Sequence, residues 1–403
     1  MRKKINSVLF FGGSNTQSSA ILQLKSLNYN IILVDKNKNC FCKKYCDYFI
    51  NYSHSDYEKI KKKINFLKKN KSIKITRFYG VSDLAYRTIA NIFDLKEYKK
   101  FIYKKKTKIL LHKHLDTPRF LPLGYKKEII KNLKYYKNKL KIFLKKSKST
   151  NFLLKPSYGI SSEGIKIFKK KEFYENFNYN YSRLIDKLEN NYDYFIEDYI
   201  NGKIVNIDFV KKKDNFIFFP LIERSSLNFR DNKSLITALQ YHSNLKIGNN
   251  IYKNISKLFI MNFKNYNGPV TLDCIISKKK IFVLEASPHF HNIKFLDFLF
   301  NIKAFEDHEK QTNKKSIKII IRKKYGGYCH FYKENFISKN ITKFLKKRNF
   351  TLFKDRFQNP GKKLFFDSLK VKKPNLSLLY YIAPSKKQLI EINSYVKKVY
   401  KNI

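Results

Sequence analysis

The chain has 403 residues, of which 43% are apolar, so it is long enough to form two or three packed domains. Its formal charge of +54 suggests at first a nucleic-acid or anionic-membrane partner. However, the positive residues are nearly all lysine and are spread over the whole chain. Nucleic-acid recognition favours arginine, whose guanidinium group can donate two parallel hydrogen bonds. The composition therefore argues against a nucleic-acid-binding protein, which we keep as the minor alternative.

No run of about 18 apolar residues occurs, so no membrane span is expected. The basic start is followed by only four apolar residues, 8–11, which are too few for the core of a secretion signal. Five cysteines without such a signal predict free thiols in a reducing cytoplasm rather than a disulfide framework. Three of them lie within positions 40–46 but lack a second Cys-x-x-Cys pair, so we interpret them as small structural residues rather than as a metal site.

The first 100 residues alternate between predicted strands and helices. Apolar runs predict strands at 5–11, 30–34, 48–51 and 73–78, and one-sided apolar spacing predicts helices over 14–27 and 83–93. This order predicts a parallel, Rossmann-like sheet with helices on its faces. A glycine turn follows the first strand and Asp35 ends the second, as in dinucleotide-binding domains, but GGSNTQ does not match G-x-G-x-x-G, so no nicotinamide site is expected.

The rest of the chain mixes helices with strands of the antiparallel kind. Helices are predicted before Pro118 and over 125–148, 173–190, 251–263 and 386–400. Hairpins are predicted over 152–167 and 269–284, and two strands flank the Asn-Gly turn at 201–202. Further short strands are predicted at 216–222, 317–321 and 328–332. The fold class expected is therefore α/β followed by α+β.

The hairpin over 152–167, FLLKPSYGISSEGIKI, combines a lysine with a tip rich in glycine and serine. Backbone N–H groups in such a tip can face phosphate oxygens without a Cβ in the way, and Lys155 on the flanking strand adds a positive charge. The same pattern is also typical of an ordinary turn. Taken alone, the hairpin leaves phosphate binding and a plain turn both open.

The second hairpin carries two acids, Asp273 and Glu285. Pairing across the turn would bring their carboxylates side by side, where they repel each other unless a cation such as Mg²⁺ lies between them. The alternative is that both side chains point to solvent. Both lie within or at the end of apolar strands, VTLDCII and IFVLEAS, where an unpaired buried charge is costly, and this favours metal binding.

These features occur in an order that resembles the ATP-grasp superfamily, and the resemblance covers the chain from about residue 5 to its end. The segments that carry it are TKILLHKHLDTPRF, LLKPSYGISSEG, FIEDYINGK and TLDCIISKKKIFVLEAS. Each match is weak by itself, and the four together in this order are specific. The resemblance implies an N-terminal Rossmann-like domain, an ATP-grasp domain of two α+β subdomains and a small C-terminal α+β subdomain.

The resemblance also implies roles for individual residues. It implies that Lys108 and Lys155 contact the ATP phosphates and that the adenine lies at Glu197, through its carboxylate, and at the backbone of Tyr199 and Ile200. Without the neighbouring motifs, Glu197 would be interpreted as an ordinary acid at a strand end. The residues of the lid over the phosphates would be Ser157, Gly159, Ser161, Ser162 and Gly164. The metal ligands would be Asp273, Glu285 and Ser287.

The sequence departs from the family pattern on the substrate side of this site. Ser287 stands where the third metal ligand is usually Asn or Asp, and it is a weaker oxygen donor that can also act through water. His289 stands where the family usually has the arginine that steadies the substrate carboxylate, and a neutral imidazole donates one hydrogen bond without a fixed charge. Arg224 and Arg230 are candidates to supply that charge or are ordinary surface residues, and Asp208 is a candidate for the ribose contact.

The C-terminal motifs GGYCHFY, FQNPGKKL and YYIAPSKKQLIEI resemble the closing subdomain of carboxylate–amine ligases. The expected domains are 1–103, 104–305 with the nucleotide lid at about 150–200, and 306–403. The expected activity is ATP-dependent amide or peptide bond formation through an acyl phosphate, with ATP and Mg²⁺, or Mn²⁺, as cofactors. The partners would be a small carboxylate and a small amine, in a cytoplasmic protein that could form a homodimer. An ATP-grasp enzyme of purine or carboxylase type is the alternative.

Overall fold

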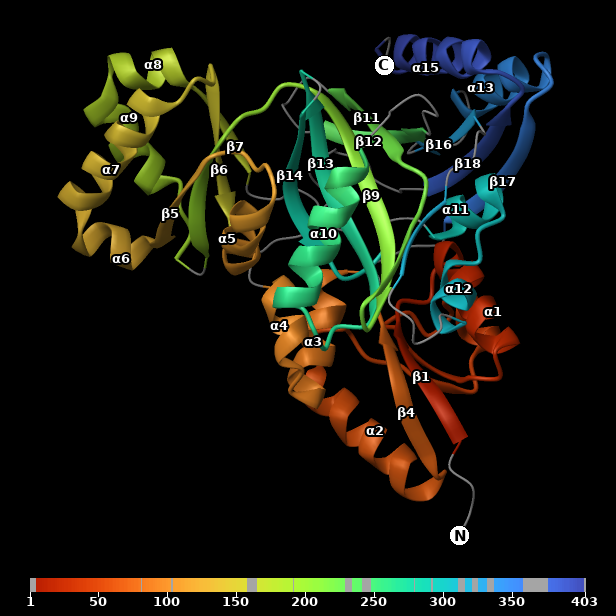
Figure 1. Ribbon diagram of the computed structural model, residues 1–403. Coiled ribbons are helices and arrows are strands. Elements are labelled where there is room, and N and C mark those ends of the chain that lie inside the picture. Colours follow the sequence, from red (N-terminus) through yellow and green to blue (C-terminus); the bar gives the residue numbers. More distant parts are fainter. Residues whose placement is uncertain are drawn as a thin grey trace.

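The fold was analysed in a computed structural model of the chain. It describes residues 5–80, 82–102, 104–157, 165–190, 192–228, 234–240, 248–278, 280–290, 293–310, 316–320, 325–331, 337–357 and 376–401. Figure 1 shows a central sheet with an N-terminal unit below it and a smaller unit to one side. In the described part of the chain, no helix has the length and hydropathy that a membrane span requires.

The N-terminal unit contains the predicted parallel sheet. Its four strands lie in the order β3-β2-β1-β4 and all neighbouring pairs are parallel. The strands are β1 (Ile5–Phe11), β2 (Asn30–Val34), β3 (Tyr48–Ile50) and β4 (Ile73–Tyr79), as expected from the apolar runs. Alternate residues of each strand face opposite sides, so this sheet needs a helical layer on both faces.

The two helical layers come from distant parts of the sequence. Leu9 and Phe11 of β1 pack in one cluster with α2 (Tyr57–Asn70), α3 (Asp83–Phe93) and α4 (Lys96–Ile102). Val8 and Phe10 pack in another with α1 (Ser18–Ser26), α11 (Ile293–Phe300) and α12 (Ala304–Glu309). The last two helices lie between β14 and β15 of the central sheet in sequence, and the sequence did not predict them. The helix predicted over 14–27 begins four residues later than expected, after a 3₁₀ turn η1 (Asn15–Gln17).

The smaller unit is an antiparallel sheet in the order β5-β8-β6-β7 with its own apolar core. Its strands are β5 (Phe120–Tyr125), β6 (Asn151–Pro156), β7 (Lys166–Lys169) and β8 (Asp193–Asp198). The predicted hairpin is confirmed, because β6 and β7 pair antiparallel from Asn151–Lys169 to Leu154–Lys166. Its helices are α6 (Lys126–Lys131), α7 (Leu133–Lys146), α8 (Lys170–Glu175) and α9 (Phe177–Asp186), which divide the two longer helices predicted there.

Within the described residues, the central sheet has ten strands: eight follow the path β14-β13-β9-β11-β12-β16-β18-β17, β10 pairs with β9, and β15 pairs with β10. The strands are β9 (Lys203–Lys212), β10 (Asn215–Phe218), β11 (Ile222–Asn228), β12 (Ser234–Gln240), β13 (Gly268–Ser277), β14 (Lys280–Ser287), β15 (Ile317–Ile319), β16 (Tyr325–Phe331), β17 (Thr351–Phe357) and β18 (Leu376–Ala383). The remaining helices are α5 (Lys104–His114), α10 (Asn249–Asn262), α13 (Ile337–Lys346) and α15 (Lys386–Lys401). Strands on both sides of the predicted boundary at residue 305 thus share one sheet, and the domain limits stay predictions.

The Asn-Gly turn at 201–202 does not join its two flanking strands into a hairpin. β8 belongs to the small sheet, whereas β9 is a central strand that pairs with β13, β11 and β10. Gly202 passes so close to β13 that a Cβ there would collide with the carbonyl oxygen of Ile276. The glycine therefore permits a crossing between two sheets rather than a tight turn, and this is why the local pattern was misleading.

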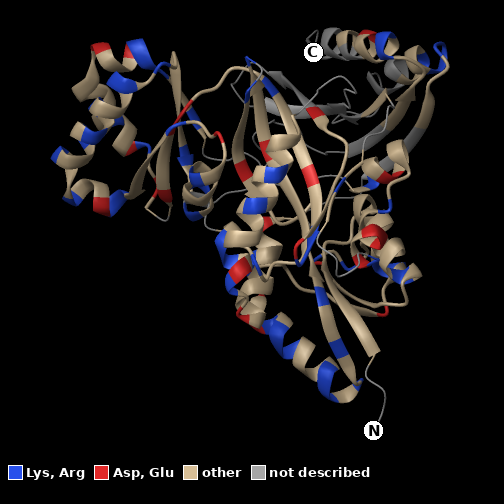
Figure 2. Cartoon of the chain, viewed as in Figure 1, with Lys and Arg blue, Asp and Glu red and all other residues tan. Residues whose placement is uncertain are grey.

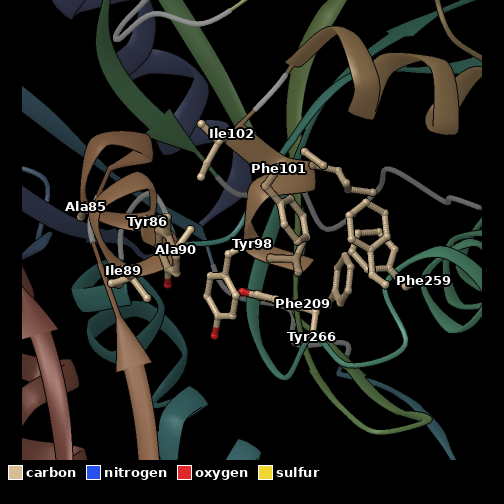
Figure 3. Packing of buried hydrophobic residues seen from close by; sticks show 14 of the residues in the cluster. Ala85, Tyr86, Ile89, Ala90, Tyr98, Phe101, Ile102, Phe209, Phe259 and Tyr266 are labelled. Carbon is tan, nitrogen blue, oxygen red and sulfur yellow. The ribbon is translucent and has the colours of Figure 1, made fainter. Parts of the chain in front are cut away.

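An aromatic cluster connects the N-terminal unit to the central sheet. Tyr98 and Phe101 of α4 lie 5.1 and 4.9 Å from Tyr266, measured between ring centroids, and Phe101 also contacts Phe259 of α10 (Figure 3). Phe259 in turn packs on Phe209 of β9. Lysine and arginine are not gathered on one element in Figure 2, where they lie on the small unit, on α2 and on the central strands.

A buried carboxylate provides a second connection between the N-terminal unit and later sequence. The carboxylate of Glu309, at the end of α12, accepts hydrogen bonds from Nε and Nη2 of Arg77 on β4, at 2.7 and 2.9 Å. It also accepts one from the hydroxyl of Tyr29 at 3.1 Å. Burial alone would raise the pKa of Glu309, but His308 and Arg77 outweigh it, so this pKa lies well below the usual 4.5. The charged form is therefore favoured in the folded state.

We predict that Glu309→Gln lowers the free energy of unfolding by roughly 2 kcal/mol at pH 7, because Arg77 loses its partner. A depressed pKa stabilises the fold fully above the unfolded value of 4.5 and ceases to do so as the pH falls through the folded value. The difference from the native chain should therefore shrink below pH 4.5 in urea unfolding. Glu58→Gln, at an exposed position on α2, is the control, and equal stability of native and Glu309→Gln chains at pH 7 would contradict the assignment.

Candidate functional site

Two lysines from different units meet at one buried carboxylate. Glu197 lies on β8 with 1% of its side chain exposed, and its Oε1 is 2.8 Å from Nζ of Lys155 on β6. Its Oε2 is 2.7 Å from Nζ of Lys108 on α5, whose side chain is 2% exposed. Lys155 retains 14% exposure. Two positive charges and one negative charge leave this buried group with a net charge of +1.

Burial and charge act in opposite directions on these groups. Burial would raise the pKa of Glu197, but Lys108 and Lys155 outweigh it and the pKa lies below its usual value. Burial lowers the pKa of Lys108, against the attraction of Glu197, and Glu285 also interacts with this lysine. The surplus positive charge therefore lies in a poorly solvated place, where it favours an anionic ligand.

The two predicted metal-binding acids are brought together as expected. Asp273 on β13 is the register partner of Glu285 on β14, and both side chains are partly exposed. Directly opposite residues of an antiparallel pair place their side chains on the same face. Asn206 of β9 lies across from Asp273 on the other side and its amide donates a hydrogen bond to Asp273 Oδ1.

A second polar row follows on the same face of the sheet. Thr271 is paired with Ser287 on one side and with Asp208 on the other, and its hydroxyl donates to Asp208 Oδ1. The opposite face of the same strands is apolar and is covered by α10, with Ile207 and Leu272 in one cluster with Ile255 and Phe259. One face of three strands thus packs in the core while the other carries these polar and acidic side chains.

A β-bulge connects the acid pair to the lysines. The register shifts between Asp273 and Cys274, so that Cys274 pairs with Val283 and Leu284 is the extra residue of β14. The carbonyl oxygen of Leu284 accepts a hydrogen bond from Lys108 Nζ at 2.9 Å. Lys108 therefore contacts Glu197 on one side and the residue next to Glu285 on the other, so that the lysine pair and the acid pair lie close together.

The oxygen donors suit a hard divalent cation. Among the described residues, no group of three or more His, Cys, Asp and Glu side chains could hold a metal ion. Mg²⁺, however, is usually bound by one or two carboxylates together with water and substrate phosphates, without a complete protein cage. Asp273 and Glu285, with Ser287 in the next row, fit that mode, and the lysines nearby fit the phosphates.

Part of the predicted lid lies outside the described residues, namely Gly159, Ser161, Ser162 and Gly164. Ser157 is buried at the end of β6, its N–H donates to the carbonyl oxygen of Asp193 at 2.6 Å, and its hydroxyl has no partner among the described residues. Arg230 is also outside the description, and only the backbone of Arg224 is described, as part of β11. The lid and arginine assignments stay predictions.

The segment expected to hold the adenine differs in detail from the expectation. Both carboxylate oxygens of Glu197 are occupied by lysines. The N–H of Tyr199 donates a hydrogen bond to the backbone carbonyl oxygen of Asn151 at 3.1 Å. The carbonyl oxygen of Tyr199 accepts one from the Ser149 hydroxyl. Tyr199 thus ties the chain to the start of β6, and the adenine assignments of Glu197, Tyr199 and Ile200 stay predictions.

The imidazole of His289 is buried and stacks on a residue of the N-terminal unit. Its ring lies 6.2 Å from that of Tyr86 on α3, at an interplanar angle of 18°, and Tyr86 stacks in turn on Tyr98. Sequence reasoning missed Tyr86, and it also missed Asn206 and Thr271. The signal for Asn206 was present, because the polar residues at 206 and 208 interrupt the apolar strand KIVNIDFV with a period of two.

Solved structures with the same arrangement cover nearly the whole chain. N5-carboxyaminoimidazole synthetase from Staphylococcus aureus, solved with ADP, matches with a TM-score of 0.68 at 14% identity over 98% of both chains. L-amino acid ligase from Bacillus licheniformis matches with a TM-score of 0.65 at 12% identity over 99% of this chain and 98% of that one. Phosphoribosylglycinamide synthetase from Anaerococcus prevotii matches with a TM-score of 0.61 at 13% identity, over 97% and 98%.

This chain has the ATP-grasp fold. The fold class predicted from the four motifs is therefore confirmed. No family model matches the sequence, and no curated protein matches it either. The ATP-grasp fold is thus recognisable in the three-dimensional arrangement although the sequence has diverged far from its structural relatives.

We predict that Glu197→Gln lowers the free energy of unfolding by roughly 3 kcal/mol, because the buried ammonium group of Lys108 and the partly buried one of Lys155 lose their counter-ion. The double variant Glu197→Gln with Lys108→Met should recover part of this loss, since it removes one uncompensated buried charge. Urea denaturation at pH 7 measures both changes. A double variant that is no more stable than Glu197→Gln would contradict the charge balance described above.

Proposed function

We propose that this protein is an ATP-dependent ligase that joins a carboxylate to an amine through an acyl phosphate and releases ADP and phosphate. The observation that carries the proposal is the buried, net positive group of Lys108, Lys155 and Glu197 beside the paired carboxylates of Asp273 and Glu285. Phosphoryl transfer needs such a combination, because catalysis consists mainly of positioning the phosphates and neutralising their charge.

The structural relatives support this class of reaction. Two of these structural neighbours were solved with ADP and with ATP, and a third is an L-amino acid ligase. At 11–14% identity these names indicate the type of chemistry but not the substrates. The purine-type synthetases among them keep the alternative of a purine-pathway carboxylation or ligation open.

In the proposed first step, an oxygen of the substrate carboxylate attacks the γ-phosphorus of ATP and the bond to the β-γ bridging oxygen breaks, which yields an acyl phosphate and ADP. Lys108 and Lys155 would move from Glu197 to the phosphate oxygens and neutralise the transferring group. Asp273 and Glu285, with Ser287, would hold Mg²⁺, which when bound screens the negative charge shared by ATP and the carboxylate. Glu197 then serves as the counter-ion of both lysines between turnovers.

In the second step, the amine attacks the acyl carbon and phosphate leaves with the bonding electrons, while a base accepts the amine proton. Water must be excluded because it would hydrolyse the acyl phosphate. The residues 157–164, which join β6 to β7, are the proposed lid over the phosphates. Arg224, Arg230 and His289 are the candidates for stabilising the oxyanion of the tetrahedral intermediate, as a fixed charge or as a hydrogen-bond donor.

The test is ADP release from Mg-ATP across a panel of amino acid and carboxylate pairs, with mass spectrometry of the products. We expect a pair that releases ADP and phosphate together with an amide product. Glu285→Gln should lower kcat by about 100-fold or more, because one of two metal carboxylates is lost. Glu58→Gln, exposed on α2, is the matched control and should match the native chain.

Two outcomes would overturn parts of the proposal. If the native chain neither binds Mg-ATP nor releases ADP with any pair, the ligase function is wrong. Nucleic acid bound only at low salt, without ATP binding, would then support the basic-protein alternative. If Glu285→Gln is as active as the native chain, the metal assignment is wrong.

A further inference from the structure

The hairpin that carries the proposed metal ligands ends in two prolines. Thr271 and Ser287 form the outermost register pair of β13 and β14, and beyond them lie Pro269 on one strand and Pro288 after the other. Proline has no backbone N–H, so it cannot donate a ladder hydrogen bond. The pairing of this hairpin therefore cannot be extended at its open end by donors from these two residues.

A tyrosine hydroxyl supplies the missing donor. Tyr266 Oη lies 2.5 Å from the carbonyl oxygen of Pro269 and 3.2 Å from that of Pro288, so its proton bridges the two strand ends. Pro288 stands between Ser287 and His289, the two positions at which the sequence departs from the ATP-grasp pattern. A single hydroxyl thus connects the start of β13 to the segment that presents these two side chains.

Contacts of the ring and of the backbone fix the position of Tyr266. The ring of Tyr266 is fully buried between Tyr98 and Phe101 of α4 (Figure 3). Its carbonyl oxygen accepts a hydrogen bond at 2.9 Å from Lys211, a lysine with no exposed surface. Gly268 has a φ of +156° and approaches so closely that a Cβ there would lie 3.0 Å from Tyr266 Oη. A side chain fixed in this way can determine the position of the groups it contacts.

We propose that Tyr266 is a positioning residue: its hydroxyl clamps the open end of the β13–β14 hairpin and holds Ser287 and His289 in the geometry that metal and substrate binding require. This inference rests on the proposed function. Tyr266 does not itself contact the ligand in this account. It acts through the backbone at Pro288, and loss of its hydroxyl should loosen the metal side of the site at the open end of the hairpin. Lys108 and Lys155 lie on α5 and β6 and keep their ion pairs with Glu197.

The experiment measures metal binding rather than turnover. Mn²⁺ is titrated into the full chain with ADP present, and free Mn²⁺ is followed by electron paramagnetic resonance. Tyr266→Phe keeps the ring and removes the hydroxyl, and we expect its Mn²⁺ affinity to fall about 10-fold. ADP affinity without metal, measured by calorimetry, should be unchanged. Tyr98→Phe, the same change in the neighbouring ring of the cluster, should alter neither quantity.

Lys211→Met is the second variant, for the case in which Tyr266→Phe does not fold. It removes the hydrogen bond to the Tyr266 carbonyl but leaves the hydroxyl, so we expect a smaller loss of Mn²⁺ affinity. Equal Mn²⁺ affinity in the native chain and in the folded variants would overturn the positioning role alone. Equal losses in Tyr266→Phe and Tyr98→Phe would overturn it in favour of general packing. No Mn²⁺ binding by the native chain with ADP would overturn the proposed metal site and this inference with it.

Discussion

The structure depends on one energetically unfavourable arrangement, a buried carboxylate that two lysines share. Desolvation of Glu197, Lys108 and the partly buried Lys155 is unfavourable, and their mutual attraction offsets it only in part. The second positive charge, which has no carboxylate of its own, adds to the desolvation penalty. A fold with such a group between two sheets needs a favourable interaction that compensates this desolvation penalty. An anionic ligand offers that interaction, and the partly exposed Lys155 gives it access. The acid pair on β13 and β14 supplies the negative charge that a bound cation would need. This pair lies close to Lys108, whose Nζ donates to the carbonyl oxygen of Leu284, next to Glu285.

Local patterns in the sequence predicted much of the fold. The alternation of apolar runs and one-sided helices was sufficient for the parallel sheet, because its two central strands, β1 and β2, are buried along most of their length. The hairpin β13–β14 was predictable because a short lysine-rich turn leaves one pairing that buries Val270, Leu272 and Val283 together. Regular pairing outward from this turn would place Asp273 opposite Leu284, next to Glu285, and the bulge at Leu284 brings Glu285 itself opposite Asp273.

The parts that could not be predicted are those decided by distant residues. Nothing local to Asn201 and Gly202 shows that β9 prefers β13 to β8 as its partner. The bulge at Leu284 is invisible in the sequence, yet it exposes the carbonyl that Lys108 uses. The two lysines at Glu197 come from positions 89 and 42 residues earlier, and the stack of His289 on Tyr86 spans two units. The resemblance implied adenine for the carboxylate of Glu197, which in this structure forms ion pairs with two lysines, and the site assignments stay predictions.

The separate apolar core of the small sheet has a mechanical consequence. Leu111 and Leu115 of α5 belong to the large apolar cluster, whereas Glu197 lies on the small sheet, which has its own cluster. The ion pair between Lys108 and Glu197 therefore joins elements of two separate cores, beside the ring contact of His112 with Phe120. A ligand that takes over Lys108 would remove this charge contact between the two cores. Occupancy of the site and the connection between the cores in this way depend on the same ammonium group.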